Sequence, residues 1–320
     1  MTDSSWENAP RQDRVAFDLN HVLSSIVSIK SHIPEDAFTA TVLGTERVGS
    51  GVVIREDGVI LTVGYLVTEA ETIWITDNKG RAISGTVLGY DQESGLGLIQ
   101  ALGKLDLPAI DIGSSAAIEE GDKVILAGHG GRRGAVSANV IGLREFAGYW
   151  EYLLDRAIFT APAHPNWGGT GLISADGKLL GIGSLFIQQS QEGQQPVDGN
   201  MVVPIDLLAP IYDDMLTYGF PNKPQRPWLG VFCTEAEDRL VVAGVSEGGP
   251  ADLADLQSGD LIQKIDGRPV STLADFFRQI WSLGPAGVEV PITVHRDGER
   301  LDLSVPSIAR RDLLKGPQLH

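Results

Sequence analysis

Two side chains that together could carry nucleophilic chemistry lie in one loop of this sequence. Thr170 supplies a hydroxyl, and His164, six residues before it, supplies an imidazole. His129 lies in a second glycine-rich loop, LAGHGGRRG. Acyl transfer by a hydroxyl needs a base within hydrogen-bonding reach and a group that orients the base. One hypothesis is therefore a Thr170–His164 dyad, whereas His129 is expected to be a surface loop residue rather than a ligand.

The sequence offers no pattern for a metal or an organic cofactor. Cys233 is the single cysteine, which excludes an internal disulfide and a cysteine-based zinc site. We find neither a cluster of metal-ligating residues nor a glycine loop that cradles phosphate. We therefore predict that no cofactor and no metal take part, and the lone thiol favours a reducing compartment.

Composition excludes several classes of partner. The 25 Lys and Arg against 42 Asp and Glu give a net charge of −17, which repels nucleic-acid phosphates and anionic membranes. Residues 1–14 lack the charged start and apolar run of a signal peptide, and no apolar run reaches the ~18 residues that a membrane span needs. We therefore predict a cytoplasmic protein that binds no nucleic acid and has no membrane span.

From about residue 40 to residue 210 the sequence consists of short β-branched runs separated by glycine-containing turns. About a dozen runs recur roughly every 8 to 15 residues, which is typical of sandwiches and barrels. The expected strands are 41–43, 51–54, 59–63, 72–76, 85–89, 96–101, 123–127, 138–143, 156–160, 171–174, 179–186 and 201–204. Before them, residues 15–33 predict a short helix that leads into a strand, and residues 190–200 predict a polar loop.

A second domain is expected after residue 220. Residues 205–218 have helical spacing, and the proline-rich segment 221–227 predicts a linker. The elements expected beyond it are strands 229–233, 240–245, 260–265, 288–296 and 299–305, a short helix at 251–256 and an amphipathic helix at 273–283. The predicted organisation is an N-terminal extension (1–24), a β-barrel domain (25–220), the linker (221–227), a second domain (228–308) and a tail (309–320).

Three segments of the barrel domain resemble the HtrA (DegP/DegQ-like) family of trypsin-fold serine proteases. The strand and hairpin before the family's catalytic histidine resemble GSGVVIREDGVILT at residues 49–62. The strand that carries its aspartate resembles YDQESGLGLIQ at residues 90–100, and its nucleophile loop resembles HPNWGGTGLISADGKLLGI at residues 164–182. The resemblance implies a chymotrypsin/trypsin-like double β-barrel.

The family's catalytic residues are replaced at the matching positions. Tyr65 stands at the histidine position and Gly95 at the aspartate position. The serine position falls on Gly168, or on Trp167 if the match is shifted by one residue. Because hydroxyl, base and carboxylate act together, these replacements predict a pseudoprotease rather than an enzyme. Tyr65 and Trp167 are expected to fill the former cleft, and a retained peptide-binding cleft is the alternative.

The second domain resembles the family's PDZ module, so the expected fold class is mostly β, with a double barrel followed by an α+β PDZ domain. The signature matches GGPADLADLQSGDLIQKIDGRPV at residues 248–270, with Asp255 where glycine is usual. The family's opening turn offers backbone N–H groups to a peptide's terminal carboxylate, and the next strand pairs with the peptide. The residues expected to bind peptide are Trp228, Leu229, Gly230, Val231, Phe232, Phe276 and Ile280.

The leading interpretation is a non-catalytic adaptor or scaffold that binds extended peptides or protein C-termini. Two alternatives stay open: an endopeptidase with a relocated nucleophile at Thr170, and a chaperone-like holdase. The resemblance also implies a role in protein quality control and a homotrimer, for which Trp6 and Phe17 are the candidate contacts.

Overall fold

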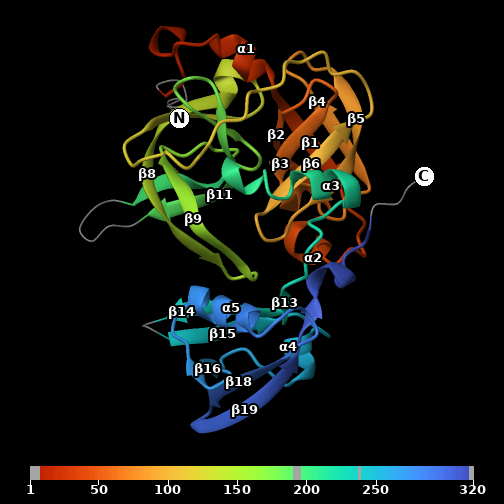
Figure 1. Ribbon diagram of the computed structural model, residues 1–320, viewed down its shortest axis with the longest axis vertical. Coiled ribbons are helices and arrows are strands. Elements are labelled where there is room, and N and C mark those ends of the chain that lie inside the picture. Colours follow the sequence, from red (N-terminus) through yellow and green to blue (C-terminus); the bar gives the residue numbers. More distant parts are fainter. Residues whose placement is uncertain (1–7, 190–195, 237–238, 317–320) are drawn as a thin grey trace. The chain divides into compact units, whose positions relative to one another are not determined.

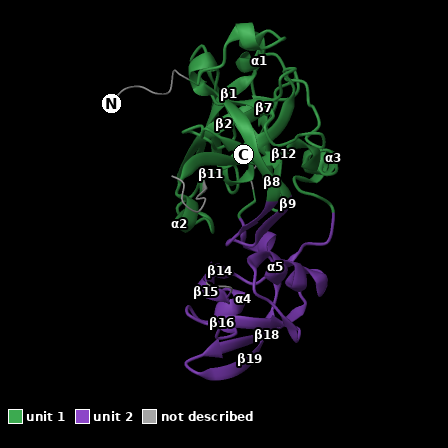
Figure 2. Ribbon diagram, turned by 90° about the vertical axis from the view of Figure 1, so that its left-hand side faces the viewer, with its two compact units in different colours: residues 1–144, 156–222, 315–320 green, residues 145–155, 223–314 purple. Residues whose placement is uncertain are grey.

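The computed structural model describes residues 8–189, 196–236 and 239–316, which divide into two compact units. The first unit contains the chain up to Arg144, Arg156–Asn222 and the stretch from Lys315 onward (Figure 2). The second unit contains Glu145–Asp155 and Lys223–Leu314. A short segment from the middle of the sequence therefore packs with the C-terminal unit.

The first unit begins with a closed antiparallel barrel (Figure 1). Its strands are β1 (Ile26–His32), β2 (Glu46–Val53), β3 (Val59–Val63), β4 (Thr72–Thr76), β5 (Ala82–Tyr90) and β6 (Leu96–Ala101), in the spatial order β1-β2-β3-β6-β5-β4. β3 is buried at every position, which explains why its sequence is a continuous apolar run rather than an alternating one. Ile29, Ile60 and Ile75 are fully buried in this barrel.

A second closed barrel follows in the order β10-β11-β12-β9-β8-β7. Its strands are β7 (Lys123–Ala127), β8 (Ala135–Gly148), β9 (Tyr152–Ala161), β10 (Gly171–Ile173), β11 (Leu179–Gln189) and β12 (Val197–Pro204). The buried side chains of Leu126, Ile158, Leu172 and Val202 form its core. β12 begins within the segment expected to be a polar loop, so that expectation is wrong from Val197 onward.

Short helices connect the strands of the first unit. They are α1 (Leu19–Ser24), α2 (Ala40–Leu43), α3 (Tyr212–Tyr218) and the 3-10 turns η2 (Gln12–Arg14), η3 (Gly64–Leu66), η4 (Gly131–Gly134) and η5 (Ile205–Leu207). Asp18 caps α1 by accepting the His21 N–H at 3.1 Å. The predicted helix that leads into a strand is therefore confirmed by α1 and β1.

α2 corrects the strand expected at residues 41–43. Leu43 donates its N–H to the Thr39 carbonyl at 2.9 Å, and the Glu69 carboxylate accepts the N–H of Phe38 at 3.1 Å and of Thr39 at 2.7 Å. A carboxylate at the start of a helical turn satisfies its free N–H groups. Because Glu69 is 30 residues away from Thr39, the local β-branched pattern gave no indication of this helix.

The second unit contains a six-stranded sheet and two helices. Its elements are β14 (Val231–Ala236), β15 (Arg239–Val245), α4 (Pro250–Leu253), β16 (Leu261–Ile265), β17 (Arg268–Pro269), α5 (Leu273–Ser282), β18 (Glu289–Arg296) and β19 (Glu299–Pro306). β13 (Pro227–Trp228) pairs separately with β20 (Ile308–Ala309), which precedes η6 (Arg310–Leu313). The order β14-β15-β16-β18-β19 leaves β14 at one edge of the sheet.

The amphipathic pattern at residues 273–283 forms α5 as predicted. Thr272 caps the helix by accepting the Asp275 N–H at 3.1 Å. Its buried stripe consists of Leu273, Ala274, Phe276, Phe277 and Ile280. This stripe anchors α5 on the sheet, so one wall of the expected peptide groove is held by the core.

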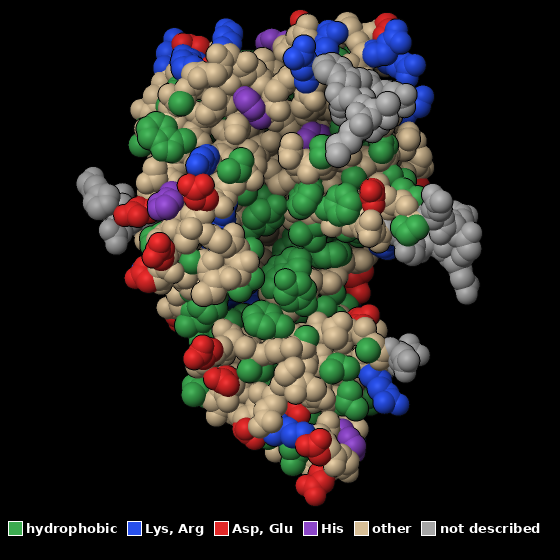
Figure 3. Space-filling view, turned by 180° about the vertical axis from the view of Figure 1, so that it is seen from behind, with side chains coloured by type: hydrophobic (Ala, Val, Ile, Leu, Met, Phe, Trp, Pro, Cys, Tyr) green, Lys and Arg blue, Asp and Glu red, His purple; other side chains and the backbone are tan. Residues whose placement is uncertain are grey.

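The predicted fold class, two closed β-barrels followed by an α+β domain, is confirmed. None of the described helices is long and apolar enough to cross a bilayer. On the face seen in Figure 3, acidic side chains are scattered over the surface, and Lys and Arg gather mainly along its upper edge.

Candidate functional site

Tyr65 stands at the position where the family resemblance places a general base. It lies in η3, directly after β3, and its phenol donates to the Ser184 carbonyl at 3.0 Å. Burial raises the pKa of this phenol above its ordinary value, while a hydrogen bond with Trp167 acts in the opposite direction. The side chain is therefore a neutral, hydrogen-bonded group.

Gly168 and Gly95 lie in the same neighbourhood. A Cβ added to Gly168 would come within 2.6 Å of the Tyr65 hydroxyl oxygen. The Gly95 carbonyl accepts the Gly64 N–H at 2.7 Å, one residue before Tyr65. The fold thus brings Tyr65, Gly95 and Gly168 together, whereas their equivalence to catalytic positions stays a prediction.

The hypothetical Thr170–His164 dyad is not formed. Thr170 is fully buried, and its hydroxyl donates to the Trp167 carbonyl at 2.9 Å. His164 accepts the Asn166 N–H at Nδ1 (3.1 Å), so Nε2 carries the hydrogen that it shares with the Gly134 carbonyl at 2.8 Å. Burial lowers the pKa of this imidazole. Both side chains therefore form hydrogen bonds with backbone groups of nearby turns and not with each other.

His129 also has a structural role in the loop. Its N–H donates to the Ser50 hydroxyl at 3.1 Å, and Nε2 lies 3.0 Å from the Asp77 carbonyl. These contacts connect the loop after β7 with the first barrel. Among the described residues, no three His, Cys, Asp or Glu side chains gather as a metal site.

The loop before β14 forms a carboxylate-binding turn. Glu151 Oε1 accepts the backbone N–H groups of Leu229 (3.1 Å), Gly230 (2.9 Å) and Val231 (3.4 Å). Gly230 has a φ of +74°, the left-handed conformation that turns successive N–H groups toward one anion. Three of the residues predicted to bind a peptide carboxylate thus converge on a carboxylate oxygen.

Glu151 reaches this loop from the turn between β8 and β9. The residue is buried and has a φ of +62°. Burial raises the pKa of its carboxyl group from 4.5 to about 7, because the three N–H groups and the nearby Arg310 guanidinium only partly offset the loss of hydration. The group therefore changes its charge close to neutral pH.

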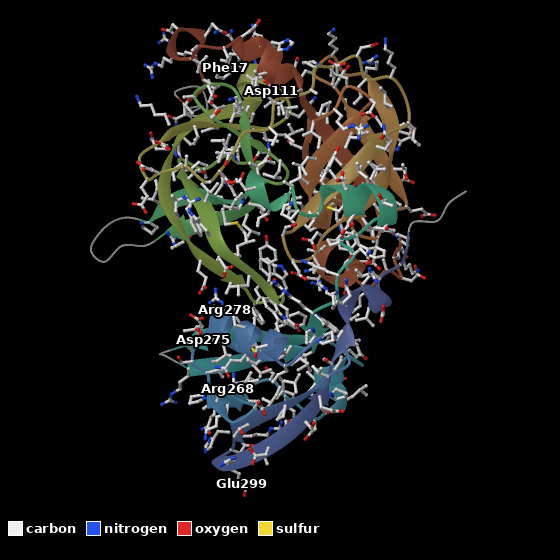
Figure 4. All side chains as sticks on the ribbon, in the orientation of Figure 1. Phe17, Asp111, Arg268, Asp275, Arg278 and Glu299 are labelled. Atoms are coloured by element: carbon white, nitrogen blue, oxygen red, sulfur yellow. The ribbon has the colours of Figure 1, made fainter. Side chains whose placement is uncertain are left out.

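Other hairpin residues contact both walls of the expected groove. The Tyr149 ring meets the Phe232 ring of β14 edge-on, with centroids 6.2 Å apart at 73°. Arg278 on α5, labelled in Figure 4, forms ion pairs with both Glu145 and Asp155. Ala147 and Leu153 pack against the hydrophobic core of the unit.

The remaining predicted groove residues are mostly enclosed. Phe276 and Ile280 are 0% and 1% exposed, respectively, and belong to the core of the unit. Trp228 is 5% exposed, whereas Phe232 is half-buried beside Tyr149. The role of these side chains in ligand binding stays a prediction, and Phe276 and Ile280 offer no free surface in the described structure.

Sequence reasoning missed Glu151 and the hairpin around it. The expected strands ended at residue 143 and resumed at 156, whereas β8 runs to Gly148 and β9 starts at Tyr152. The signal was the clustering of aromatic side chains, Tyr149, Trp150 and Tyr152, in a segment read as a connection. Such a cluster is unusual for a free turn and indicates packing against a partner.

Two domain-family models match different parts of the chain. The trypsin-like peptidase domain model matches residues 49–182, and the PDZ domain model matches residues 227–306. A probable periplasmic serine endoprotease DegP-like of Pseudomonas fluorescens is 29% identical over 287 residues, which is 83% of this chain and 58% of the relative. Serine endoprotease DegS of Escherichia coli K12 is 28% identical over 82% of this chain and 77% of its own length. The chain thus spans under two thirds of the DegP-like relative.

A solved structure shares the fold. The HtrA-type protease AlgW with tripeptide superposes with a TM-score of 0.52 at 22% identity, covering 94% of this chain and 97% of that chain. At this identity the likeness shows the fold alone.

These comparisons contradict the prediction that the chain is not an enzyme. The relatives are named serine endoproteases, which points to protease activity, and nothing in the comparisons shows a lost triad. The prediction was wrong because it inferred inactivity from three residue types in short, ungapped motif matches.

Proposed function

We propose that this chain, an HtrA/DegS-family trypsin-like peptidase domain with a PDZ domain, binds extended peptides or protein C-termini. Binding takes place through the PDZ domain, and the chain acts as a peptide-binding adaptor. The observation that carries the proposal is the turn at Leu229–Val231. Its three N–H groups already hold one carboxylate oxygen, at 2.9 to 3.4 Å. A chain terminus offers the same chemical group.

The position of β14 supports an extended ligand. β14 is an edge strand that pairs with β15, and in the described residues no strand pairs with its other edge. Unpaired N–H and C=O groups at a sheet edge can accept a further strand. A peptide whose terminal carboxylate sits in the turn would run alongside β14.

The test measures binding of peptides to the full chain by fluorescence anisotropy. An array of labelled decapeptides is synthesised with free C-termini, and each member has a C-terminally amidated twin. We expect free-carboxylate peptides to bind on the order of tenfold or more tighter than their twins, because hydrogen bonds to a charged group contribute about 1.5–3 kcal/mol. Equal binding of both sets would argue against the carboxylate turn as the site.

Peptide cleavage is the second candidate function, and the names of the relatives favour it. Casein incubated with the purified chain and with Thr170→Ala, followed by mass spectrometry, tests it. Because Thr170 is buried and its hydroxyl donates to the Trp167 carbonyl, we expect any cleavage to be retained in Thr170→Ala, which would assign another group. Cleavage lost in a Thr170→Ala protein that is still folded would assign the Thr170 hydroxyl.

Other roles are distinguished by further measurements. A holdase would suppress aggregation of many unfolded clients, whereas an adaptor prefers peptides with a shared C-terminal pattern.

The homotrimer stays a prediction: the Phe17 ring lies against Gly177 of its own chain, and Trp6 lies outside the described residues. The cytoplasmic location and the role in quality control also stay predictions, and the DegP-like relative is named periplasmic.

A further inference from the structure

The segment Glu145–Asp155, here called the docking hairpin, packs in one compact unit with residues of the PDZ domain. It consists of the end of β8, the turn with Glu151 and the start of β9. Figure 2 shows it in the colour of the C-terminal unit. The hairpin therefore belongs to the peptidase domain by sequence but packs against the hydrophobic core of the PDZ domain.

The Glu151 carboxylate has the same hydrogen-bonding partners that a bound chain terminus would use. It accepts from Leu229, Gly230 and Val231, and each of these contacts is buried. A backbone N–H that points into one turn cannot serve two carboxylates at full strength, and two anions at this distance repel each other. Glu151 and a peptide terminus therefore exclude each other from the turn.

The rest of the docking hairpin contacts the two walls of the groove. Arg278 of α5 forms ion pairs with Glu145 on β8 and Asp155 on β9, one on each strand of the hairpin. On the β14 side, Tyr149 covers Phe232. A ligand in the groove would meet these same surfaces, so the competition extends beyond the carboxylate.

The docked state combines favourable and unfavourable contributions. Three N–H groups and the Arg310 guanidinium favour the carboxylate, whereas burial and the left-handed backbone of Glu151 oppose docking. Exposed ion pairs such as those of Arg278 add little stability. Such a balance is suited to an internal contact that an external ligand can displace.

We propose that the docking hairpin is an internal ligand of the PDZ domain, in which Glu151 occupies the carboxylate turn until a peptide with a free C-terminal carboxylate displaces it. This inference rests on the proposed peptide-binding function. The apparent affinity for peptide is then reduced by the fraction of molecules in which the hairpin is docked. Removing the Glu151 carboxylate should tighten peptide binding.

The test compares the full chain with Glu151→Gln, Glu151→Ala and Arg278→Ala, and with Glu56→Ala as a control that removes an exposed carboxylate from the β2–β3 turn. Hydrogen exchange is measured at the amides of Leu229, Gly230 and Val231. We expect exchange there to be about tenfold or more faster in Glu151→Ala than in the parent and in Glu56→Ala. The same array of free-carboxylate decapeptides should bind on the order of tenfold tighter to Glu151→Ala. The gain should be much smaller for Arg278→Ala, which leaves the turn intact and removes only exposed ion pairs.

The outcomes separate the two proposals. Unchanged exchange at the three amides together with unchanged peptide affinity in Glu151→Ala would overturn the internal ligand, and peptide binding could still stand. Faster exchange without binding of any free-carboxylate peptide would support an occupied turn and overturn the peptide-binding function. Circular dichroism of Glu151→Ala checks that its faster exchange does not reflect unfolding, and Glu151→Gln, which keeps the side-chain volume, should show the same direction of change.

Discussion

The hydroxyl oxygen of Tyr65 lies where a side chain on Gly168 would have to begin, since a Cβ there would be 2.6 Å from it. The two residues come from η3 and from the loop before β10, more than 100 positions apart in sequence. Tyr65 is held in place by its hydrogen bond to the Ser184 carbonyl. The phenol therefore occupies the space that a side chain at Gly168 would need, and none can be added there without displacing Tyr65.

Gly168→Ser should lower the free energy of unfolding by about 1–3 kcal/mol, because its Cβ would displace the Tyr65 ring in a packed interior. Adding Tyr65→His, which replaces the phenol by a smaller ring, should recover part of this loss. Urea denaturation of both single variants and the double variant measures the coupling. Additive losses would show that the two positions do not share space.

The Gly230→Ala variant tests the carboxylate turn through backbone geometry. A Cβ at Gly230 would lie 2.8 Å from the Trp228 ring and 3.0 Å from the Ser246 Cβ, in addition to the strain of φ +74°. We expect a loss of peptide affinity of tenfold or more, an order-of-magnitude estimate for misplacing charge-assisted hydrogen bonds.

Gly267→Ala is the matched control for Gly230→Ala. Gly267 has the same φ of +74°, but a Cβ there meets no atom within 4 Å. The backbone strain should be similar, about 1 kcal/mol, with peptide affinity unchanged. A comparable loss of affinity in both variants would attribute the effect to general destabilisation instead of the turn.

Arg47 tests the buried polar network beneath η3. Its guanidinium donates to the carbonyls of Tyr65 at 2.7 Å and Thr68 at 3.0 Å and to the Thr39 hydroxyl at 2.7 Å, and burial lowers its pKa to about 10. Arg47→Lys should reduce the free energy of unfolding by about 1–3 kcal/mol, because an ammonium cannot reproduce this fork. The exposed Arg11, which forms an ion pair with Asp13 on the surface, serves as the control. Thermal or urea unfolding should show little change for Arg11→Lys.

Local patterns predicted much of the fold and little of the candidate site. The buried run at β3 and the amphipathic stripe of α5 were recognisable because each follows from its own residues. α2 was misread because its N-terminus depends on Glu69, and the carboxylate in the PDZ turn was missed because Glu151 lies 79 residues from Gly230. Contacts at such separations are set by the packing of whole elements, which periodicity does not describe.

The pH dependence of the docked hairpin follows from the pKa of Glu151, which burial raises from 4.5 to about 7. In this window the docked state binds more protons than the undocked state, so docking is strongest below pH 4.5 and weakens as pH rises through 7. A pKa shift from 4.5 to about 7 corresponds to about 3 kcal/mol of docking free energy that is lost as pH rises across this window. The charged groups beside Glu151 do not change this sign: the Arg310 guanidinium stays protonated, and burial together with Glu151 raises the pKa of the Cys233 thiol.

Peptide anisotropy titrations from pH 5.5 to 8 should therefore show affinity that rises with pH in the parent chain, as Glu151 becomes easier to displace. In Glu151→Gln the group cannot titrate, so its affinity should vary much less over the same range. The terminal carboxylate of a free peptide has an ordinary pKa near 3.5 and stays ionised in solution throughout. A parallel slope in both proteins would locate the pH dependence in the peptide or elsewhere in the groove, because the difference between the two chains isolates the Glu151 carboxyl.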